Sequence, residues 1–287
     1  MTAALTAARK NFHDELVDRQ TLSLSLDGVA SNADSSQRTS VDVALRIAKD
    51  LSTQTIPKKL TGQRVGKQFE EAVEGFLSET FPLFQSLRPG HWSIENVGGS
   101  RSEYQISKYE PYTHLADLAN AIRSDRNLAS VLGNSYEISP DILILRNPEP
   151  DSVINRDYDL VDSKSGQHAA IRSANQPHPI VHAIVSCKWT LRSDRAQNAR
   201  SEALNVIRNR KGRTPHIAVV TGEPSPSRLA SLALGTGDID TVYHFALPEL
   251  ITAVQETQND EAISMLHTLV SGKRLRDISD LPLDLAI

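Results

Sequence analysis

The sequence predicts an α/β protein in which a central mixed β-sheet is flanked by helices. Three short apolar runs have the length and composition of strands, at residues 142–145, 183–190 and 217–221. Helical patterns separate these runs without a strict alternation of strand and helix, so we expect a mixed sheet. No long Pro-, Gly- or Ser-rich linker divides the 287 residues, and the sequence therefore predicts a single domain over residues 1–287.

Composition argues against several classes of protein. The 39% hydrophobic and 23% charged residues are typical of a globular protein, and no apolar run has the length of a membrane span or the form of a signal peptide. Cys187 is the only cysteine, which excludes an intramolecular disulfide and a multi-cysteine zinc site and suits a reducing cytoplasm. The nine histidines are scattered without an H-E-x-x-H motif, which argues against zinc hydrolysis and Cys/His nucleophilic catalysis.

The N-terminal region alternates helical and polar stretches. Residues 3–20 have helical composition, and residues 27–40 form a polar loop that is either a linker or a place for ligand contacts. Ser40 is expected to cap a short helix over residues 41–51.

A second helix is predicted after Pro57, over residues 61–81. Its apolar stripe consists of Val65, Phe69, Ala72, Val73 and Phe76. At about 100° per residue, Glu70 falls on the margin of this stripe and Glu71 on the far side. Of the two acids, Glu70 is the one expected to face inward.

The remaining elements are predicted from shorter patterns. Residues 88–110 are expected to form a hairpin around Gly98 and Gly99, and residues 113–132 a helix. The G-x-G of residues 232–245 lacks a third glycine and predicts a turn, not a nucleotide loop. Further expectations are irregular chain at 151–180, helices at 247–257 and 260–271, and a C-terminal tail.

Residues 183–202, AIVSCKWTLRSDRAQNARSE, change period from strand to helix at their centre. Strand alternation places Ser186 and Lys188 on the same face as Ile184, and Ser193 or Asp194 is expected to cap the following helix. From residue 188 to 213 there are eight Lys/Arg against two acids, although the whole chain has a net charge of −4. Such a stripe fits phosphate contact, but a solvated helix face with i,i+4 pairs explains it equally.

Three polar residues suggest a chemistry. Asp141 precedes one strand, Lys188 lies on another, and Glu202 lies on the following helix. Converging carboxylates favour a hard cation such as Mg²⁺, and a neighbouring lysine can hold a phosphate. The set therefore fits metal-assisted phosphodiester hydrolysis, although an aspartate at a strand start is also a common cap or turn residue.

The spacing of these residues resembles a known family. Pro140-Asp141, forty-six intervening residues, Lys188, thirteen more and Glu202 are similar to the permuted PD-(D/E)xK motif of type IIF restriction endonucleases that read a CCGG core. Ser186 stands where the usual acid precedes the lysine, and Glu202 resembles its substitute. The similarity extends to ASNAD (30–34), KWTLRSDRAQNARSE (188–202), EPSPSR (223–228) and GKRLRDISDLPLDLA (272–286).

The resemblance implies a restriction-endonuclease-like fold and Mg²⁺-dependent cleavage of double-stranded DNA by a homotetramer, a dimer of dimers. The implied target is GCCGGC, cut to leave 5′ overhangs, and a cognate DNA methyltransferase would protect the host DNA. The implied catalytic residues are Asp141, Lys188, Glu202, Glu70 and Ser186. The implied metal ligands are Asp141, Glu70 and the main-chain carbonyl of Cys187.

The resemblance also assigns residues that contact DNA. Arg192, Asp194 and Arg195 would read the CCGG core in the major groove, where arginine forks fit guanine and aspartate can accept from cytosine. The implied minor-groove and outer base-pair contacts are Gln63, Asp34, Ser36 and Arg228. Two alternatives remain from the residues: a non-catalytic sequence-specific DNA-binding protein, and a repair or structure-specific nuclease of the same fold.

Overall fold

The computed structural model describes residues 2–57, 60–98, 105–125, 127, 130–131, 138–191, 193–235 and 237–287. Six described strands form one sheet whose spatial order, β1 to β6, equals their order in the chain. They are β1 (Trp92–Asn96), β2 (Ile142–Arg146), β3 (Ile180–Lys188), β4 (His216–Thr221), β5 (Thr241–His244) and β6 (Leu275–Asp277). The first two pairings are antiparallel and the last three are parallel, which confirms the predicted mixed sheet.

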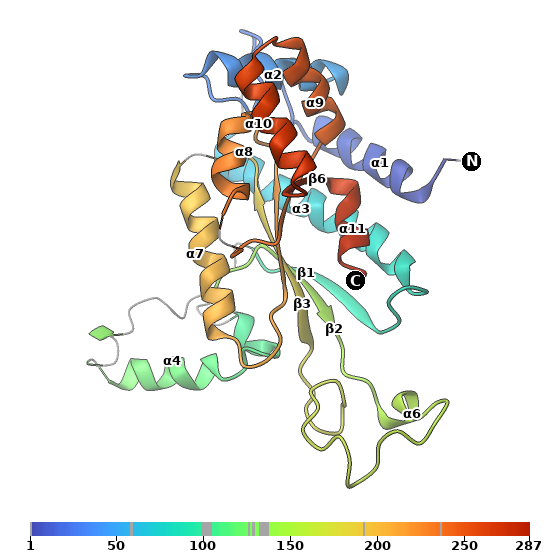
Figure 1. The fold of residues 1–287 in the computed structure, drawn as a ribbon. Coiled ribbons are helices and arrows are strands. Elements are labelled where there is room, and N and C mark those ends of the chain that lie inside the picture. The colour runs from blue at the N-terminus through green and yellow to red at the C-terminus, as the bar shows by residue number, and fades with distance from the viewer. Residues whose placement is uncertain are drawn as a thin grey trace.

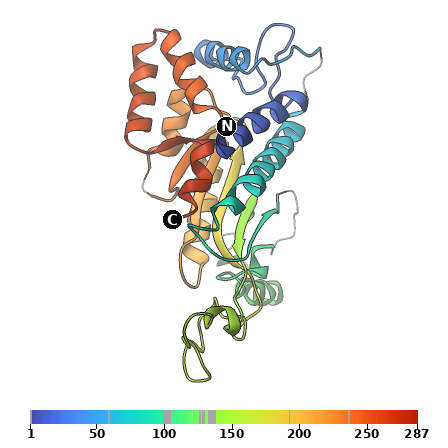
Figure 2. The same cartoon turned by 90° about the vertical axis from the view of Figure 1, so that its right-hand side faces the viewer.

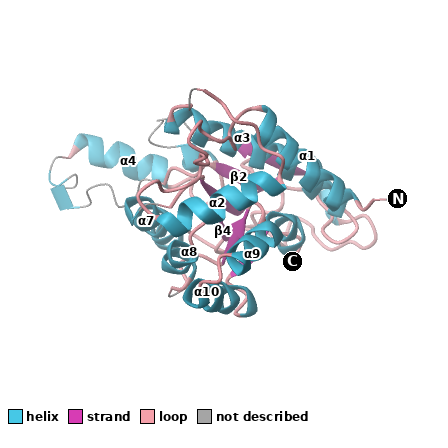
Figure 3. Cartoon of the chain, turned by 90° about the horizontal axis from the view of Figure 1, so that it is seen from above, coloured by secondary structure: helices cyan, strands magenta, loops and turns pink. Residues whose placement is uncertain are grey.

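Helices cover both faces of this sheet, as Figure 3 shows from above. On one face lie α1 (Ala4–Asp18) and α3 (Gly62–Thr80), and on the other lie α7 (Ser193–Asn209), α8 (Pro226–Ala233) and α10 (Asp260–Ser271) (Figures 1 and 2). The others are α2 (Arg38–Asp50), α4 (Leu115–Ser124), α6 (Asp151–Ile154), α9 (Leu247–Glu256) and α11 (Leu281–Asp284). The segment around α6 extends away from the sheet (Figure 1).

The core explains why the two central strands are nearly continuous apolar runs. Residues 142–145 of β2 have no exposed surface, and the interior of β3 is buried along its whole length. A strand covered on both faces needs no polar alternation. The predicted stripe of α3 is buried as expected, and Phe69 packs its ring 5.0 Å from that of Trp189, just after β3.

Several local predictions are wrong. In place of the hairpin predicted over residues 88–110, β1 pairs with β2 and residues 105–108 form a 3₁₀ helix; residues 99–104, with Gly99, lie outside the described residues. Ser40 lies inside α2, which begins at Arg38, and its hydroxyl accepts from the Asp34 amide. β5 and β6 were not predicted, because strands of four and three residues are too short to show a period.

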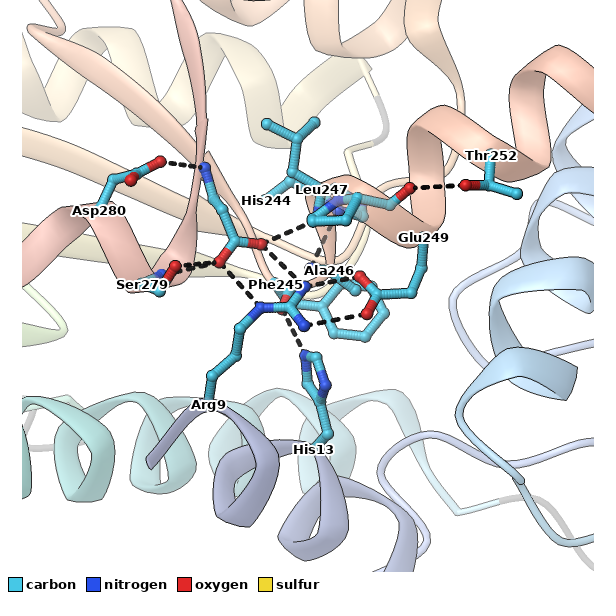
Figure 4. A network of polar contacts seen from close by, with 12 residues as sticks. Arg9, His13, His244, Phe245, Ala246, Leu247, Glu249, Thr252, Ser279 and Asp280 are labelled. Atoms are coloured by element: carbon cyan, nitrogen blue, oxygen red, sulfur yellow. Dashed lines mark hydrogen bonds and ion pairs between the residues drawn. The ribbon is translucent and has the colours of Figure 1, made fainter. Parts of the chain in front are cut away.

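A partly buried ion cluster fixes α1 to the C-terminal half of the chain (Figure 4). The Arg9 guanidinium donates to both oxygens of Glu249, at 2.9 and 2.6 Å, and to both oxygens of Asp277, at 2.9 Å each. Burial alone would lower the pKa of Arg9, but the two carboxylates raise it above its ordinary value. His13 donates to the main-chain oxygen of Phe245 at 2.7 Å. These contacts connect α1 to the start of α9 and the end of β6.

We predict that Gly222→Ala destabilises the protein by about 1–3 kcal/mol, a typical cost of overpacking. A Cβ atom at Gly222 would lie 2.6 Å from Trp189 Cε3 and 3.0 Å from the Trp189 main-chain oxygen. Gly75→Ala is the matched control, because a Cβ there meets nothing within 4 Å and alanine favours a helix by about 0.5–1 kcal/mol. Urea unfolding of both variants measures the difference in their unfolding free energies. Equal stability of the two would contradict the close packing of Gly222 against Trp189.

Candidate active site

Asp141 joins the ends of three strands. The register of β2 with β3 ends at Ile142 opposite Val185, so Asp141 lies one residue beyond the ladder. Its main-chain oxygen accepts from the amides of Val97 and Gly98, at 2.9 and 3.0 Å, just after β1. Its side-chain Oδ2 accepts from the Cys187 amide at 2.7 Å. Asp141 is therefore held by main-chain amides on both sides, through its main-chain oxygen on one side and its carboxylate on the other.

Lys188 meets the same carboxylate oxygen. Its Nζ lies 3.1 Å from Asp141 Oδ2, and the Ser186 hydroxyl lies 3.3 Å from that oxygen. Burial works against the charge of Lys188, but Asp141 and Glu202 outweigh it and raise the pKa of the ammonium group. Lys188 is therefore a cation in the folded protein, positioned by two acids from different elements.

Glu202 approaches from α7. Its pKa is raised by burial and by Asp141, against the opposing effects of Lys188 and of a hydrogen bond with the Ser186 side chain. Ser186 thus contacts both Asp141 and Glu202. The predicted arrangement, with Ser186 and Lys188 on one strand face beside the helix of Glu202, is the one observed.

Glu70 on α3 supplies a third carboxylate. Burial, followed by the charge of Asp141, raises the pKa of Glu70 to about 7. Its Oε2 lies close to Gly98, where a Cβ atom would come within 2.7 Å of it. Glycine at position 98 therefore leaves room for the Glu70 carboxylate beside Asp141.

These groups surround a cavity of about 560 Å³. Gln63, Glu70, Cys187, Lys188 and Glu202 line it, and so do Gly98, Trp189 and Asn198. Asn198 was not predicted as a site residue; the sequence signal was its position four residues before Glu202, on the same face of α7. The structure therefore brings together Asp141, Lys188, Glu202, Glu70, Ser186 and Cys187 from α3, β2, β3 and α7.

The donor set fits a hard divalent cation. Three carboxylates, Asp141, Glu70 and Glu202, lie around the ammonium group of Lys188, and the exposed Lys67 is a second cation on the cavity wall, so carboxylates outnumber ammonium groups at the site. Carboxylate and carbonyl oxygens are the ligands that Mg²⁺ prefers. The Cys187 thiol is fully buried and its pKa is raised, so its sulfur is protonated and unsuited to metal binding. Among the described residues, no group of three or more His, Cys, Asp or Glu side chains could hold a metal by itself. A cation held by one or two of these side chains would take its other ligands from main-chain oxygens, water or a bound substrate.

Three of the residues predicted to contact DNA meet beside this cavity. Asp34 forms an ion pair with Arg228, and it accepts from the Ser36 hydroxyl at 2.7 Å. Ser36 and Arg228 hydrogen bonds lower the pKa of Asp34 to about 2. Asp34 and Arg228 line two cavities of about 290 and 620 Å³, and Trp189 lines both the 290 Å³ cavity and the 560 Å³ cavity.

Two other predicted readers, Asp194 and Arg195, belong to the first turn of α7, where only the backbone is described. The third, Arg192, lies outside the described residues. The helix begins at Ser193, within one residue of the predicted boundary.

The basic stripe of residues 188–213 is not one continuous surface. Arg200 donates to the main-chain oxygens of Ser231, Leu232 and Leu234. It therefore supplies hydrogen-bond donors to the carbonyl groups at the end of α8. Lys211 and Arg213 line a separate cavity beside the first residues of β3. At about 3.3 Å per residue, Ile180 and Lys188 lie roughly 26 Å apart along that strand. Basic residues of the stripe therefore lie in three separate places. Lys188 lines the catalytic cavity, Arg200 contacts the end of α8, and Lys211 and Arg213 line the separate cavity.

Comparisons with known proteins agree on a family. The family model described as NgoMIV restriction enzyme matches residues 12–287. The chain is 48% identical over 287 residues to the type II restriction enzyme NgoMIV of Neisseria gonorrhoeae, with 100% of both chains covered. A solved complex of the restriction endonuclease PspGI with its substrate DNA is similar at 16% identity, over 99% of this chain and 92% of that chain, with a TM-score of 0.26. That score is too low to support an argument.

A buried acid that was not predicted as a site residue holds the loop before α7. Glu223 is fully buried, and its Oε2 accepts from the Leu191 amide at 2.7 Å while its Oε1 accepts from the Ser225 amide at 3.1 Å. Burial raises the pKa of Glu223 to about 7, against the opposing effects of Leu191 and Arg228. The signal in the sequence was an acid two residues after a strand, at the end of an apolar run, whereas Asp141 directly precedes a strand. Glu223 therefore fixes the residue that precedes Arg192.

We predict that Glu223 makes the protein less stable as pH rises. The pKa of Glu223 is about 7 in the folded chain and 4.5 in a solvated glutamate. The protonated side chain therefore contributes its full stabilisation below pH 4.5, and this stabilisation is lost as pH rises through 7. Glu223→Gln cannot ionise, so between pH 5 and 8 wild type should lose about 2 kcal/mol more unfolding free energy than this variant.

Urea unfolding at both pH values, without divalent cations, measures the change. Glu79→Gln on the exposed side of α3 is the control and should follow wild type. Parallel pH profiles for wild type and Glu223→Gln would show that Glu223 is ionised in the folded protein.

Proposed function

Because the chain belongs to the NgoMIV restriction enzyme family and is therefore a type II restriction endonuclease, we propose that it cuts duplex DNA with Mg²⁺ at a palindromic CCGG-core site. The proposed target is GCCGGC, cleaved to leave 5′ overhangs. One observation carries the proposal of a hydrolytic site: Asp141 Oδ2 meets Lys188 Nζ at 3.1 Å beside Glu202 and Glu70, at the edge of a 560 Å³ cavity.

The proposed metal ligands are Asp141, Glu70 and the Cys187 main-chain carbonyl. Mg²⁺ bound there would polarise the scissile phosphate and lower the pKa of a water molecule. Asp141 Oδ2 receives all three hydrogen bonds from Ser186, Cys187 and Lys188, so among the described residues no donor occupies its Oδ1. That oxygen is the one we assign to metal binding.

Lys188 and Glu202 have complementary roles in the proposed reaction. Lys188 presents a positive charge to the phosphate, and Asp141 and Glu202 keep it protonated. Glu202 supplies from α7 the acid that the motif normally carries on the strand, and its side chain is hydrogen-bonded to Ser186, which stands at that strand position. These interactions position the lysine and the carboxylates before DNA binds, which reduces the reorganisation needed in the transition state.

Recognition and hydrolysis share one helix in this proposal. Arg192, Asp194 and Arg195 read the core base pairs from the start of α7, and Glu202 lies seven residues after Arg195, about 10 Å along the helix axis. Gln63, which lines the catalytic cavity, is assigned to the minor groove. The cluster of Asp34, Ser36 and Arg228 is assigned to the outer base pair.

Several properties of the assembly are further proposals. The chain would act as a homotetramer of two dimers in the cytoplasm, as one domain over residues 1–287, with host DNA protected by a methyltransferase that forms no stable complex with it. The single core that runs from Ala8 to Leu285 supports one domain. Exposed Tyr158 and Leu160, on the projecting segment near α6, support contact with another copy. No described helix is long and apolar enough to cross a membrane.

We predict that Asp141→Ala and Lys188→Ala each reduce cleavage by on the order of 10³-fold or more, because each removes several kcal/mol of charge stabilisation. The assay is supercoiled plasmid with protein and Mg²⁺, followed by mapping of the ends. Lys188→Ala should still bind its target in a gel-shift assay.

Lys49→Ala, exposed at the end of α2, is the control for this assay and should cut like wild type. Discrete bands from wild type agree with site-specific cleavage. Binding without cutting would support a non-catalytic DNA-binding protein, and non-discrete nicking a repair nuclease. Near-normal cutting by Asp141→Ala or Lys188→Ala would overturn the assignment of the active site.

We predict that a plasmid with two target sites is cut faster than one with a single site, by roughly tenfold, because a linked second site has a high effective concentration. An oligonucleotide duplex carrying the site, added in trans, should accelerate cutting of the single-site plasmid. Light scattering should give the mass of four 31.5 kDa chains. Equal rates, no stimulation and a dimer mass would show that the chain acts without tetramer assembly.

A further inference from the structure

A second cavity, of about 430 Å³, lies at the end of the sheet opposite the catalytic cavity. Four cationic side chains line it, together with an indole and an imidazole: Arg88, Arg146, Lys211, Arg213, Trp92 and His182. None of these six is among the residues assigned above to catalysis, metal binding or DNA reading. Lys211 and Arg213 are the part of the basic stripe that the catalytic site does not use.

The strand register builds the wall of this cavity. Trp92 of β1 is the cross-strand partner of Arg146 of β2, so the two side chains meet. The guanidinium carbons of Arg146 and Arg88 each lie 5.5 Å from the centre of the Trp92 ring. The register of β2 with β3 shifts between Ile144 and Leu145, which leaves His182 without a partner in β2. Such a bulge redirects side chains at the end of a sheet.

His182 is a neutral hydrogen-bond acceptor toward the arginines. Its Nε2 lies 2.7 Å from the main-chain oxygen of Leu285, which can only accept, so Nε2 carries the proton. Its Nδ1 lies 3.4 Å from an Nη2 atom of both Arg88 and Arg213. Burial, together with the nearby charges of Arg88 and Arg213, lowers the pKa of His182 to about 3, against the opposing effect of the Leu285 hydrogen bond. The imidazole therefore orients two guanidinium groups without adding to or neutralising their charge.

Positive charge in the cavity exceeds the negative charge that the protein supplies there. Among the described residues, none of the four cations forms an ion pair with an Asp or Glu side chain, and the Glu110 side chain in the cavity wall accepts from Thr113 instead. Arg88 donates to the carboxyl-terminal oxygen of Ile287, which offsets the charge of one of the four cations. The Nε atoms of Arg88 and Arg146 are buried and have no partner in the described part of the chain. Burial and the neighbouring Arg213 and Arg146 lower the pKa of Arg88, which indicates uncompensated repulsion.

We propose that this cavity binds a phosphate-type oxyanion between Arg88, Arg146 and Arg213. Guanidinium groups present forked donors that match the oxygens of a phosphate, and such charge-assisted hydrogen bonds are stronger than neutral ones. A bound dianion would give the unpartnered donors an acceptor and relieve the repulsion among the arginines. The oxyanion has two sources with the same chemistry, a free phosphate ion and a phosphate of the DNA backbone.

The two tryptophans of the chain allow the two cavities to be observed separately. Trp92 lines the basic cavity, and its indole N–H donates to the Arg88 main-chain oxygen at 3.1 Å, whereas Trp189 lines the catalytic cavity. The experiment is a titration of ¹⁵N-labelled protein with inorganic phosphate, without divalent cations and at constant ionic strength in chloride. The indole resonances are followed, and Trp189→Phe assigns them.

We expect the Trp92 resonance to shift along a saturable curve. Arg146→Gln should weaken the apparent affinity at Trp92 by roughly tenfold or more, since a charge-assisted hydrogen bond contributes on the order of 1.5–3 kcal/mol. Arg208→Gln, which removes the same charge from the exposed face of α7, should bind phosphate like wild type. An unchanged Trp189 resonance in Arg146→Gln would confirm that the variant is folded.

A second titration, with a duplex of unrelated sequence, separates the sources. A saturable Trp92 shift with inorganic phosphate identifies a site for the free ion, and a shift with the duplex alone identifies a contact to the DNA backbone. Both results require that Arg146→Gln weakens the response. No saturable shift with either probe, or equal affinity of Arg146→Gln and wild type, would overturn the proposal.

Discussion

The geometry of the catalytic cavity depends on the carboxylate of Asp141. This side chain accepts a main-chain hydrogen bond just beyond the point where the ladder between β2 and β3 ends. Asp141 Oδ2 accepts the Cys187 amide that no β2 residue reaches, and its main-chain oxygen accepts the amides of Val97 and Gly98. Leaving the Cys187 amide unpaired would cost about 1–3 kcal/mol. The same oxygen positions Lys188, so the contact that completes the sheet also sets the geometry of the site.

Carboxylates outnumber positively charged side chains at this site. Glu70 and Glu202 both have raised pKa values, with burial as the largest cause and Asp141 as a further one, and Lys188 compensates only in part. A site of this kind is suited to a divalent cation, because the cation would remove the repulsion that the folded chain leaves in place. Gly98 contributes by its lack of a side chain, since a Cβ there would displace the Glu70 carboxylate.

β3 connects two sites of opposite charge. Its last residues, Cys187 and Lys188, line the acidic catalytic cavity, and its first residues, Ile180 to His182, line the basic one. The buried strand separates these cavities by roughly 26 Å along its length. The bulge at His182 belongs to the basic end, where it orients Arg88 and Arg213. The basic residues after Lys188 consequently do not share one function.

Local periodicity by itself determined the main helices and the strands at residues 142–145, 183–190 and 217–221, because burial on helices and central strands leaves a repeat in the sequence. The spacing of Asp141, Lys188 and Glu202 indicated the site, and they do converge. Tertiary structure decided what depends on distant pairing: the partner of β1, the short strands β5 and β6, the burial of Glu223 against the Leu191 amide, and the gathering of Arg88, Arg146 and Arg213. No local pattern records these contacts, since each joins residues far apart in the chain whose meeting is fixed only when the sheet closes around its core.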